Sequence, residues 1–309
     1  MKKLYLIDAS IYIFRAYFSL PDSFVDTNGR PSNAVYGFAD FLARLLAQTQ
    51  PRHIAVTFDE SLSTSFRNDM YPPYKANRDL PPPELEAQLK ACQDLSEALG
   101  LATYVSERYE ADDLIGTIAN AMRPHDFSMV VISGDKDLTQ LIADKDIWWD
   151  FTRDRQLNTD GIKQRFGVAP HQIVDLIALM GDKVDNIPGV AGIGPKTAVQ
   201  LLNHYGSLDA IYAGLEQLPV LNLRRAAKVY EWLKGSKEHA YLSQRLARIA
   251  IDAPITCRRE LLARHPVDQS ALTALCEELN FGDRMRERLK TSNNHFNSSS
   301  KFEVRSSKT

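Results

Sequence analysis

The chain has 309 residues, of which 44% are hydrophobic and 25% are charged, so it can fill a sizeable core and is not an intrinsically disordered sequence. Its net charge of −2 gives no overall attraction for a polyanion, and any phosphate-binding surface must come from locally clustered basic residues. The sequence contains no run of the roughly 18 apolar residues that a membrane span needs, and its three cysteines are too scattered for a zinc site or a disulfide framework.

The first predicted element is a buried strand over residues 4–7, an apolar run that ends at Asp8. Lys2 and Lys3 precede this run and superficially resemble the start of a secretory signal. Asp8 and Arg15 interrupt the apolar stretch, so export is not expected. We therefore expect a cytoplasmic protein without a membrane partner.

Two more apolar runs rich in β-branched residues, 54–58 and 129–132, predict further buried strands. Helical patterns at residues 34–46 and 84–99 alternate with these strands. The alternation predicts an α/β fold with a mixed, mainly parallel central sheet flanked by helices. In such sheets ligands bind at the carboxyl ends of the strands.

Acidic residues gather at the ends of these strands and in the turns and helix starts that follow them. An acid at a helix start has a simple structural explanation, because it interacts favourably with the helix dipole or caps the helix. Helix capping and the helix dipole do not explain so many acids, and we expect these residues to share one pocket. Its members are Asp8, Asp59, Glu110, Asp112, Asp113, Asp135, Asp137, Asp182 and Asp185.

Repulsion among so many carboxylates demands bound cations. Oxygen ligands without His or Cys suit Mg²⁺, for which Mn²⁺ can substitute, rather than zinc. Two such ions about 3.5–4 Å apart would activate a water and stabilise the leaving oxygen of a phosphodiester. The acids therefore predict two-metal phosphodiester hydrolysis.

From about residue 160 the strand pattern ends and short helical patterns follow. We expect an α/β core over 1–160 and a helical region over 161–290. Within the latter, Gly and Pro turns with helical flanks predict a helix-hairpin-helix at about 186–200. The tail over 291–309 is rich in Ser, Asn and Lys and is expected to be disordered.

Taken together, these motifs resemble the 5′ nuclease family, which includes flap endonucleases and the N-terminal nuclease domain of bacterial DNA polymerase I. The resemblance covers roughly residues 1–250, and the motifs occur in the family's order. They read Leu-Ile-Asp8-Ala-Ser, Phe58-Asp59, Tyr74-Lys75-Ala-Asn-Arg78, Tyr109-Glu110-Ala-Asp112-Asp113, Gly134-Asp135-Lys-Asp137-Leu, Gly181-Asp182-Lys-Val-Asp185-Asn and Gly189-Val-Ala-Gly192-Ile-Gly194-Pro-Lys196-Thr197.

The resemblance also implies how the acids divide between two metal ions. The first ion would take Asp8, Asp59, Glu110 and Asp112. The second would take Asp137, Asp182 and Asp185, while Asp113 and Asp135 bridge the ions or act through water. No acid of the family pattern is missing from this chain.

A segment rich in Ser, Pro and aromatic residues, at about 61–95, corresponds to the family's helical arch, through which the 5′ strand passes. The resemblance implies that Lys75 and Arg78 stabilise charge on the scissile phosphate. Arg67 would grip a phosphate and Tyr71 or Tyr74 would stack on a base, a combination suited to single strands. A solvated loop is the alternative, and it is a better alternative for Arg67 than for Lys75 and Arg78.

Outside the arch, the resemblance implies contacts with duplex DNA. The hairpin loop would hold backbone phosphates without sequence specificity and would bind K⁺ through its carbonyls. A plain interhelical turn is the alternative. The implied contacts are Arg15, Gly189, Gly192, Gly194, Lys196 and Thr197.

We therefore expect a stand-alone, monomeric 5′-3′ exonuclease and structure-specific flap endonuclease that acts on DNA in replication or repair. Its substrates would be junctions of single strand and duplex: 5′ flaps, nicks and 5′ overhangs. One alternative is a non-catalytic protein that binds DNA structures and whose acids only sequester metal. Another is a metal-dependent phosphatase, suggested by Asp8, although Ser10 stands where that class would have a second Asp. The balance of exonuclease and endonuclease activity stays open.

Overall fold

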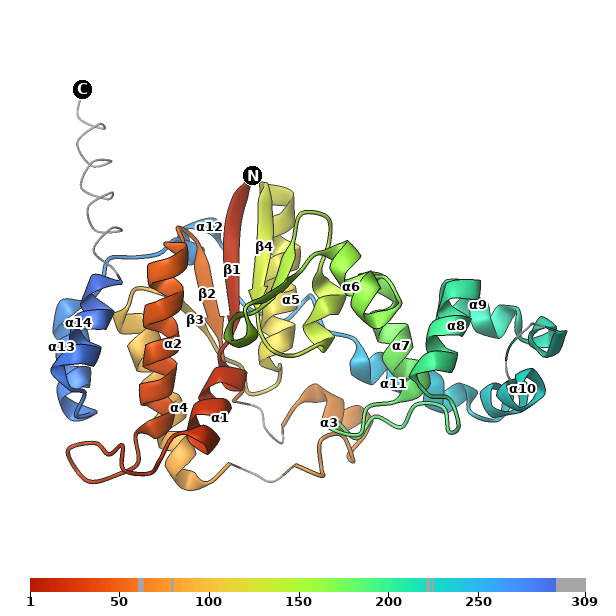
Figure 1. Cartoon of the computed structure of the whole chain (residues 1–309), viewed down its shortest axis with the longest axis horizontal. Coiled ribbons are helices and arrows are strands. Elements are labelled where there is room, and N and C mark those ends of the chain that lie inside the picture. Colours follow the sequence, from red (N-terminus) through yellow and green to blue (C-terminus); the bar gives the residue numbers. More distant parts are fainter. Residues whose placement is uncertain (61–63, 79–80, 221–222, 224, 293–309) are drawn as a thin grey trace.

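The computed structural model describes residues 1–60, 64–78, 81–220, 223 and 225–292, and its centre is a β-sheet (Figure 1). Within these residues the sheet has six strands in the order β3-β2-β1-β4-β5-β6. The strands are β1 (Lys2–Asp8), β2 (Ile54–Thr57), β3 (Ala102–Tyr104), β4 (Phe127–Ile132), β5 (Ile147–Asp150) and β6 (Arg155–Leu157). Neighbours from β3 to β5 pair in parallel, and β6 pairs antiparallel to β5. The predicted fold class is confirmed.

Helices cover both faces of the sheet and form a separate helical region. They are α1 (Ala9–Ser19), α2 (Asn33–Thr49), α3 (Phe66–Met70), α4 (Pro83–Ala98), α5 (Ala111–Met122), α6 (Thr159–Phe166), α7 (Ile173–Met180), α8 (Pro195–Tyr205), α9 (Leu208–Ala213), α10 (Ala226–Gly235), α11 (Lys237–Ala247), α12 (Arg259–Leu262), α13 (Gln269–Glu278) and α14 (Asp283–Thr291). Short 3-10 turns are η1 (Arg123–His125), η2 (Asp137–Leu141), η3 (Phe151–Arg153), η4 (Pro170–Gln172) and η5 (Leu215–Val220). In this described part, no helix is both long enough and apolar enough to cross a membrane.

The burial of the central strand β1 explains why its apolar run predicted a strand. Leu4 and Leu6 belong to one buried cluster, together with residues of α5 and α7. Ile7 belongs to the cluster on the other face, together with residues of α1, α2 and α4. A strand that is buried on both faces reads as a continuous apolar run.

The order of the strands determines where a ligand site can form. From β1 the chain builds β2 and β3 on one side, and then crosses over to place β4 on the other side of β1. The crevice at the carboxyl ends of strands where the order reverses is the usual ligand site of such sheets. Here that point is the end of β1 beside the end of β4, so the loops after both strands line the crevice.

The helical region is shorter at its C-terminal end than the predicted 161–290. After α12 the chain returns to the sheet, where α13 packs against α4 and α14 packs against α2. Leu272, Phe281 and Leu289 are buried in the same cluster as Ile7. Figure 1 shows α13 and α14 at the opposite end of the molecule from α8, α9 and α10. Residues 269–291 therefore belong to the α/β core, because their apolar faces cover α2 and α4.

The predicted arch also ends earlier than residue 95. From Pro83 the chain forms α4, and Leu85, Cys92 and Leu95 of this helix are fully buried in the core. Residues 61–63 and 79–80 of the predicted arch lie outside the described residues. At the C-terminus, α14 extends to Thr291, and the tail that we expect to be disordered lies outside the described residues from 293 onward.

Arg67 corrects a sequence prediction, because the fold buries this side chain instead of presenting it to a phosphate. Arg67 is 2% exposed, and its guanidinium donates to both carboxylate oxygens of Asp113 at 2.7 and 2.8 Å. It also donates to the backbone carbonyls of Leu246 and Arg248. Asp113 is fully buried and additionally accepts from the Ala250 amide. Both side chains are used inside the protein: the Arg67 guanidinium is not available to a phosphate, and both carboxylate oxygens of Asp113 accept from Arg67 or the Ala250 amide.

This ion pair joins α3 and α5 to the chain after α11, so its loss should destabilise the fold. We expect Arg67→Ala to lower the free energy of unfolding by roughly 3–5 kcal/mol, because a buried carboxylate is left without its partner. The control is Arg108→Ala, since Arg108 pairs with Asp69 where both side chains are exposed, 56% and 64%. That change should cost less than about 1 kcal/mol. Urea unfolding of both variants measures the difference, and similar losses would contradict the structural role of Arg67.

Candidate active site

The ends of β1 and β4 bring two of the predicted acids together. Asp8 is the last residue of β1, and Asp135 follows β4 by three residues. Ser133 links them, because its hydroxyl donates to the Asp8 carboxylate at 2.7 Å and accepts from the Asp135 amide at 2.9 Å. The Asp137 amide donates to the Asp135 carboxylate at 2.8 Å. The loop after β4 is therefore fixed against the end of β1.

The start of α5 supplies the next group of acids. Asp59, two residues after β2, accepts from the Ala111 amide at 2.7 Å, and Ala111 is the first residue of α5. Glu110 caps this helix, and Asp112 lies in its first turn. The positive end of the helix dipole therefore points at a group of carboxylates, which favours their charged forms.

Burial and mutual repulsion perturb the carboxyl groups in this crevice. Burial, followed by the charge of Asp59, raises the pKa of Asp8 to about 7. Burial and the charges of Asp135 and Asp8 raise the pKa of Asp112 well above its usual range. The pKa of Asp135 is also raised, mainly by burial. Each of these acids feels its neighbours, so Asp8, Asp59, Asp112 and Asp135 form one electrostatic cluster.

Asp137 carries a further perturbed carboxyl group. Burial and the charge of Asp135 raise its pKa to about 7. Its Oδ1 atom is buried and has no hydrogen-bond partner among the described residues, although the Lys136 ammonium lies 3.7 Å away. A buried carboxylate oxygen without a hydrogen bond is costly unless another ligand satisfies it.

The predicted acid motif that contains Asp182 and Asp185 lies in the turn after α7. Gly181 begins this turn with a φ of +71°, and a side chain there would collide with the Ile187 carbonyl. Asp182 accepts from the Val184 amide at 2.7 Å and pairs with the Lys136 ammonium at 2.6 Å. Although burial acts in the opposite direction, Lys136 holds the pKa of Asp182 below its usual range. Lys136 is a site residue that the sequence analysis missed.

Lys75 and Arg78 reach the acids from the predicted arch. The Lys75 ammonium lies 2.9 Å from a Glu110 oxygen, and Arg78 pairs with Asp185. Burial opposes the change, but Lys75 and Arg67 together lower the pKa of Glu110. Both predicted catalytic cations therefore lie at the acid site.

Tyr74 corrects one of the two stacking alternatives. It is 3% exposed, and its hydroxyl donates to Glu110 at 3.1 Å. A buried ring cannot stack on a base of a bound strand. Tyr71, which is partly exposed, remains the candidate.

Backbone and side-chain amide contacts hold the arch residues 73–77 against the turn that carries Asp182 and Asp185. The Lys75 amide donates to the Asp185 carbonyl at 3.0 Å. The Asn186 side chain donates to the Pro73 carbonyl at 2.7 Å, and the Asn77 side chain donates to the Lys183 carbonyl at 3.0 Å. These contacts, which sequence patterns did not indicate, fix Lys75 beside the acids.

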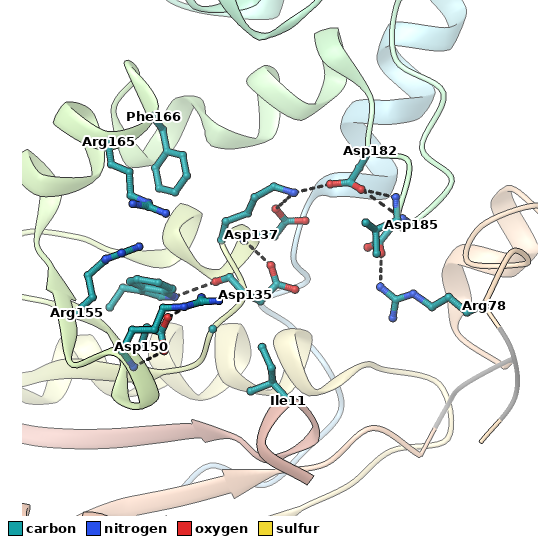
Figure 2. Close-up of a pocket in the computed structure, with 15 residues that line it drawn as sticks. Ile11, Arg78, Asp135, Asp137, Asp150, Arg155, Arg165, Phe166, Asp182 and Asp185 are labelled. Atoms are coloured by element: carbon teal, nitrogen blue, oxygen red, sulfur yellow. Dashed lines mark hydrogen bonds and ion pairs between the residues drawn. The ribbon is translucent and has the colours of Figure 1, made fainter. Parts of the chain in front are cut away.

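A cavity of about 400 Å³ opens beside the acids (Figure 2). Asp135, Asp137, Asp182 and Asp185 line one side of it. The lining also includes Arg78 from the arch and three arginines that the sequence analysis did not single out, Arg153, Arg155 and Arg165.

The acid site combines carboxylates with the cations that pair with them. In the described part of the chain no three His, Cys, Asp or Glu residues are arranged so that they could hold an ion as they stand. Lys75, Lys136 and Arg78 each take a carboxylate of the site. The donor set nevertheless fits a hard divalent cation, because it consists of carboxylate oxygens, several with raised pKa values, and includes the unsatisfied oxygen of Asp137.

The predicted hairpin loop connects α7 and α8. Gly189 is buried, and its amide donates to the Ser243 hydroxyl at 2.9 Å, so this amide is not available to a phosphate. Gly192 has a φ of +92° and packs against the Trp232 ring, where a side chain would collide. Gly194 faces open space before α8.

The other predicted DNA contacts differ in exposure. Lys196 is exposed and Thr197 is partly exposed in the first turn of α8. Arg15 is exposed on α1, which starts directly after Asp8. These positions leave Lys196, Thr197 and Arg15 accessible to a ligand.

Comparisons with known proteins agree over most of the chain. Residues 3–167 match the family model described as 5′-3′ exonuclease, N-terminal resolvase-like domain, and residues 168–270 match 5′-3′ exonuclease, C-terminal SAM fold. DNA polymerase I of Bacillus caldotenax is 40% identical over 285 residues, which are 91% of this chain and 32% of that protein. DNA polymerase I of Pseudomonas aeruginosa is 39% identical over 279 residues, 90% of this chain and 30% of that protein. The chain thus spans about a third of the length of these curated relatives.

Solved structures share the fold. The T5 5′-exonuclease with bound zinc superposes with a TM-score of 0.65 at 22% identity, covering 94% of this chain and 98% of that one. The catalytic core of Rad2 in complex with DNA substrate gives a TM-score of 0.61 at 15% identity, covering 93% and 91%. The two domain models of one family match the chain in order, and the fold brings the acid motifs from both matched regions to one crevice. The chain therefore belongs to the 5′-3′ exonuclease family.

Proposed function

We propose that this chain is a two-metal-ion phosphodiester hydrolase that cuts DNA near the junction of a single-stranded 5′ end and a duplex. It would act as a 5′-3′ exonuclease and as a 5′-flap endonuclease in replication or repair. The observation that carries the proposal is the group of buried carboxylates at the strand crossover, with Lys75 and Arg78 held against it by the contacts of the arch segment. Membership of the 5′-3′ exonuclease family supports it.

The acids would divide between two Mg²⁺ ions, with Mn²⁺ as a substitute. Besides burial, the charges of Asp59 and Asp135 raise the pKa of Asp8, and those of Asp135, Asp8 and Asp59 raise the pKa of Asp112, so we propose Asp8, Asp59, Asp112 and Asp135 as the ligands of one ion. Asp137, Asp182 and Asp185 would hold the other. When bound, such ions supply an activated water and stabilise charge on the leaving oxygen. Glu110 would keep its pairs with Lys75 and Tyr74 and so orient both side chains.

Lys75 and Arg78 would bind and orient the scissile phosphate. Positioned cations next to a phosphate stabilise the charge that develops in the transition state, and they do so without reorganising during the reaction. The contact between the Lys75 amide and the Asp185 carbonyl already sets the backbone in place. Entry of a phosphate would draw Arg78 from Asp185 and leave that carboxylate to a metal ion, while Lys75 keeps its pair with Glu110.

Duplex DNA would lie along α1 and the start of α8. Lys196, Thr197 and the open backbone at Gly194 would contact phosphates there, with K⁺ bound at the loop, and Arg15 would contact DNA near Asp8. Tyr71 would stack on a base of the single strand. Two similar structures are those of the T5 flap endonuclease with DNA and metal ions and of the Rad2 core with DNA substrate. We further propose that the chain acts as a cytoplasmic monomer.

Replacement of one acid from each metal set should abolish cleavage. We expect Asp8→Ala and Asp185→Ala to lower the single-turnover rate at least about 100-fold, a loss typical for charge-stabilising groups. The assay is cleavage of an end-labelled 5′-flap duplex in Mg²⁺ and K⁺, with an excess of chelator as a second control. Asp144→Ala, a change at an exposed acid that does not line the cavity, should keep the rate of the intact protein. If the intact protein binds the flap in Ca²⁺ but leaves it whole in Mg²⁺, a structure-binding role replaces the nuclease.

The raised pKa values predict how pH changes stability. Without metal, Asp8 and Asp137 have pKa values of about 7 in the folded chain, so between about pH 4 and 7 the folded state binds more protons than the unfolded state. These two groups therefore make the metal-free fold less stable as pH rises through this window. Mg²⁺ must displace the same protons, so the stabilisation that it gives should be small near about pH 5.5 and large near about pH 8.

Thermal unfolding with chelator or with Mg²⁺ across this pH range measures both effects. The matched variant is Asp8→Asn with Asp137→Asn, in which the metal-free stability should depend less on pH and Mg²⁺ should stabilise little. An equal gain in melting temperature from Mg²⁺ at both ends of the range would contradict the prediction.

A further inference from the structure

Three arginines form part of the cavity beside the acids. Figure 2 shows Arg155, Arg165 and Phe166 on one side of the cavity and Asp135, Asp137, Asp182 and Asp185 on the other. Arg153 also lines it. Asp150 also lines the arginine wall, as the partner of Arg153, and Lys136 and Arg78 pair with the acids, so the arginine wall has a net positive charge and the acid wall a net negative charge.

The fold holds these arginines in place. Arg153 is in the turn after β5, and its guanidinium donates to the buried Asp150 carboxylate at 3.0 Å. Arg155 is the first residue of β6, and its backbone lies opposite that of Asp150 in the antiparallel ladder. Arg165 lies in the last turn of α6, with its guanidinium 5.5 Å from the centre of the Phe166 ring. Backbone pairing, an ion pair and a ring contact thus give the wall its form.

The charges on the two walls do not neutralise each other through direct contacts. Asp182 and Asp185 pair with Lys136 and Arg78. Among the residues that the structure describes, Arg155 and Arg165 have no carboxylate within ion-pair distance. A guanidinium presents a planar fork of donors that matches a phosphate, so two such groups lining one cavity indicate an anionic ligand from outside the chain.

We propose that Arg153, Arg155 and Arg165 form a subsite for a second phosphate of the strand that is cut. The cavity volume of about 400 Å³ lies in the range of roughly 300–1,000 Å³ found for sites of small ligands, so it can take a sugar-phosphate unit. Phe166 gives the sugar or base an apolar surface. The inference deepens the proposed function and rests on it.

The subsite would give the bound strand a second point of contact with the protein. Lys75 and Arg78 approach the acids from the arch, whereas the arginine wall is built by β6 and α6. A strand with one phosphate at the acids would therefore be held at a neighbouring phosphate on the other side. The second phosphate is either the terminal 5′-phosphate of a nick or an internal phosphodiester of a flap.

The test uses Arg155→Gln with Arg165→Gln in the full chain. Lys163→Gln is the matched control, because Lys163 is exposed on the same helix α6 but does not line the cavity. Arg153 is left unchanged, since its pair with Asp150 also supports the fold. Binding of a nicked duplex and of a 5′-flap duplex is measured in Ca²⁺ over a salt series, each with a 5′-phosphate or a 5′-hydroxyl end.

We expect the double variant to bind about 10-fold more weakly at low salt and to reduce the salt slope of log K by about one, as loss of one phosphate contact should. If the loss occurs only with the phosphorylated nick, the subsite takes the terminal phosphate; if it occurs with both ends, it takes an internal phosphodiester. If the double variant unfolds, Arg165→Gln alone replaces it in the same binding measurement, because Arg165 is exposed.

Unchanged affinity and salt slope in a folded variant would overturn the subsite, and the arginines would then only balance the charge of the acids. The nuclease proposal would survive that result as long as the intact protein binds and cuts the flap. If the intact protein bound neither duplex, the proposed function itself would fail.

Discussion

Repulsion among buried carboxylates at the carboxyl ends of β1 and β4 governs much of the rest of this structure. The pKa of Asp8, raised from 3.8 to about 7, corresponds to a cost on the order of 4 kcal/mol for ionising this one group in the folded chain at neutral pH. Asp112, Asp135 and Asp137 add costs of the same sign. A domain whose stability is typically about 5–15 kcal/mol can carry such a cluster only with compensation nearby.

The compensation comes from elements far apart in the sequence. The N-terminus of α5 points its amides at Asp59, and Ser133 donates to Asp8. Lys75 neutralises Glu110, while Lys136 neutralises Asp182. Each of these partners also fixes a backbone segment, so balancing the charge and building the site are one physical process. The segment that carries Lys75 is consequently held at the acids in advance of any substrate.

The fold class and the location of the acids could be predicted because both leave local signals. Strands buried on both faces, such as β1 and β4, read as unbroken apolar runs, and acids directly after them must lie at one edge of a parallel sheet. The strands β3, β5 and β6 were not predicted. The strand β5 has four residues, whereas β3 and β6 have three each and β6 has the sequence Arg155-Gln156-Leu157. Edge strands this short carry no usable periodicity.

The errors concern contacts that only the folded chain creates. Arg67 and Tyr74 have the composition of a DNA-binding loop, but their partners Asp113 and Glu110 lie 46 and 36 residues away. The carbonyl of Leu246, a further partner of Arg67, is 179 residues away. The return of α13 and α14 to the core likewise depends on the apolar faces that α2 and α4 leave to be covered. In the same way, the arginine wall forms only when β6 and α6 meet beside the acids.

The central claim is that these acids hold two divalent ions, and direct counting of bound Mn²⁺ by electron paramagnetic resonance tests it most closely. The account predicts two ions per chain near neutral pH and a single ion in Asp182→Asn with Asp185→Asn, because that change removes ligands of only one site. Saturation at no ions or at one ion in the intact chain, or an unchanged count in the variant, would contradict it.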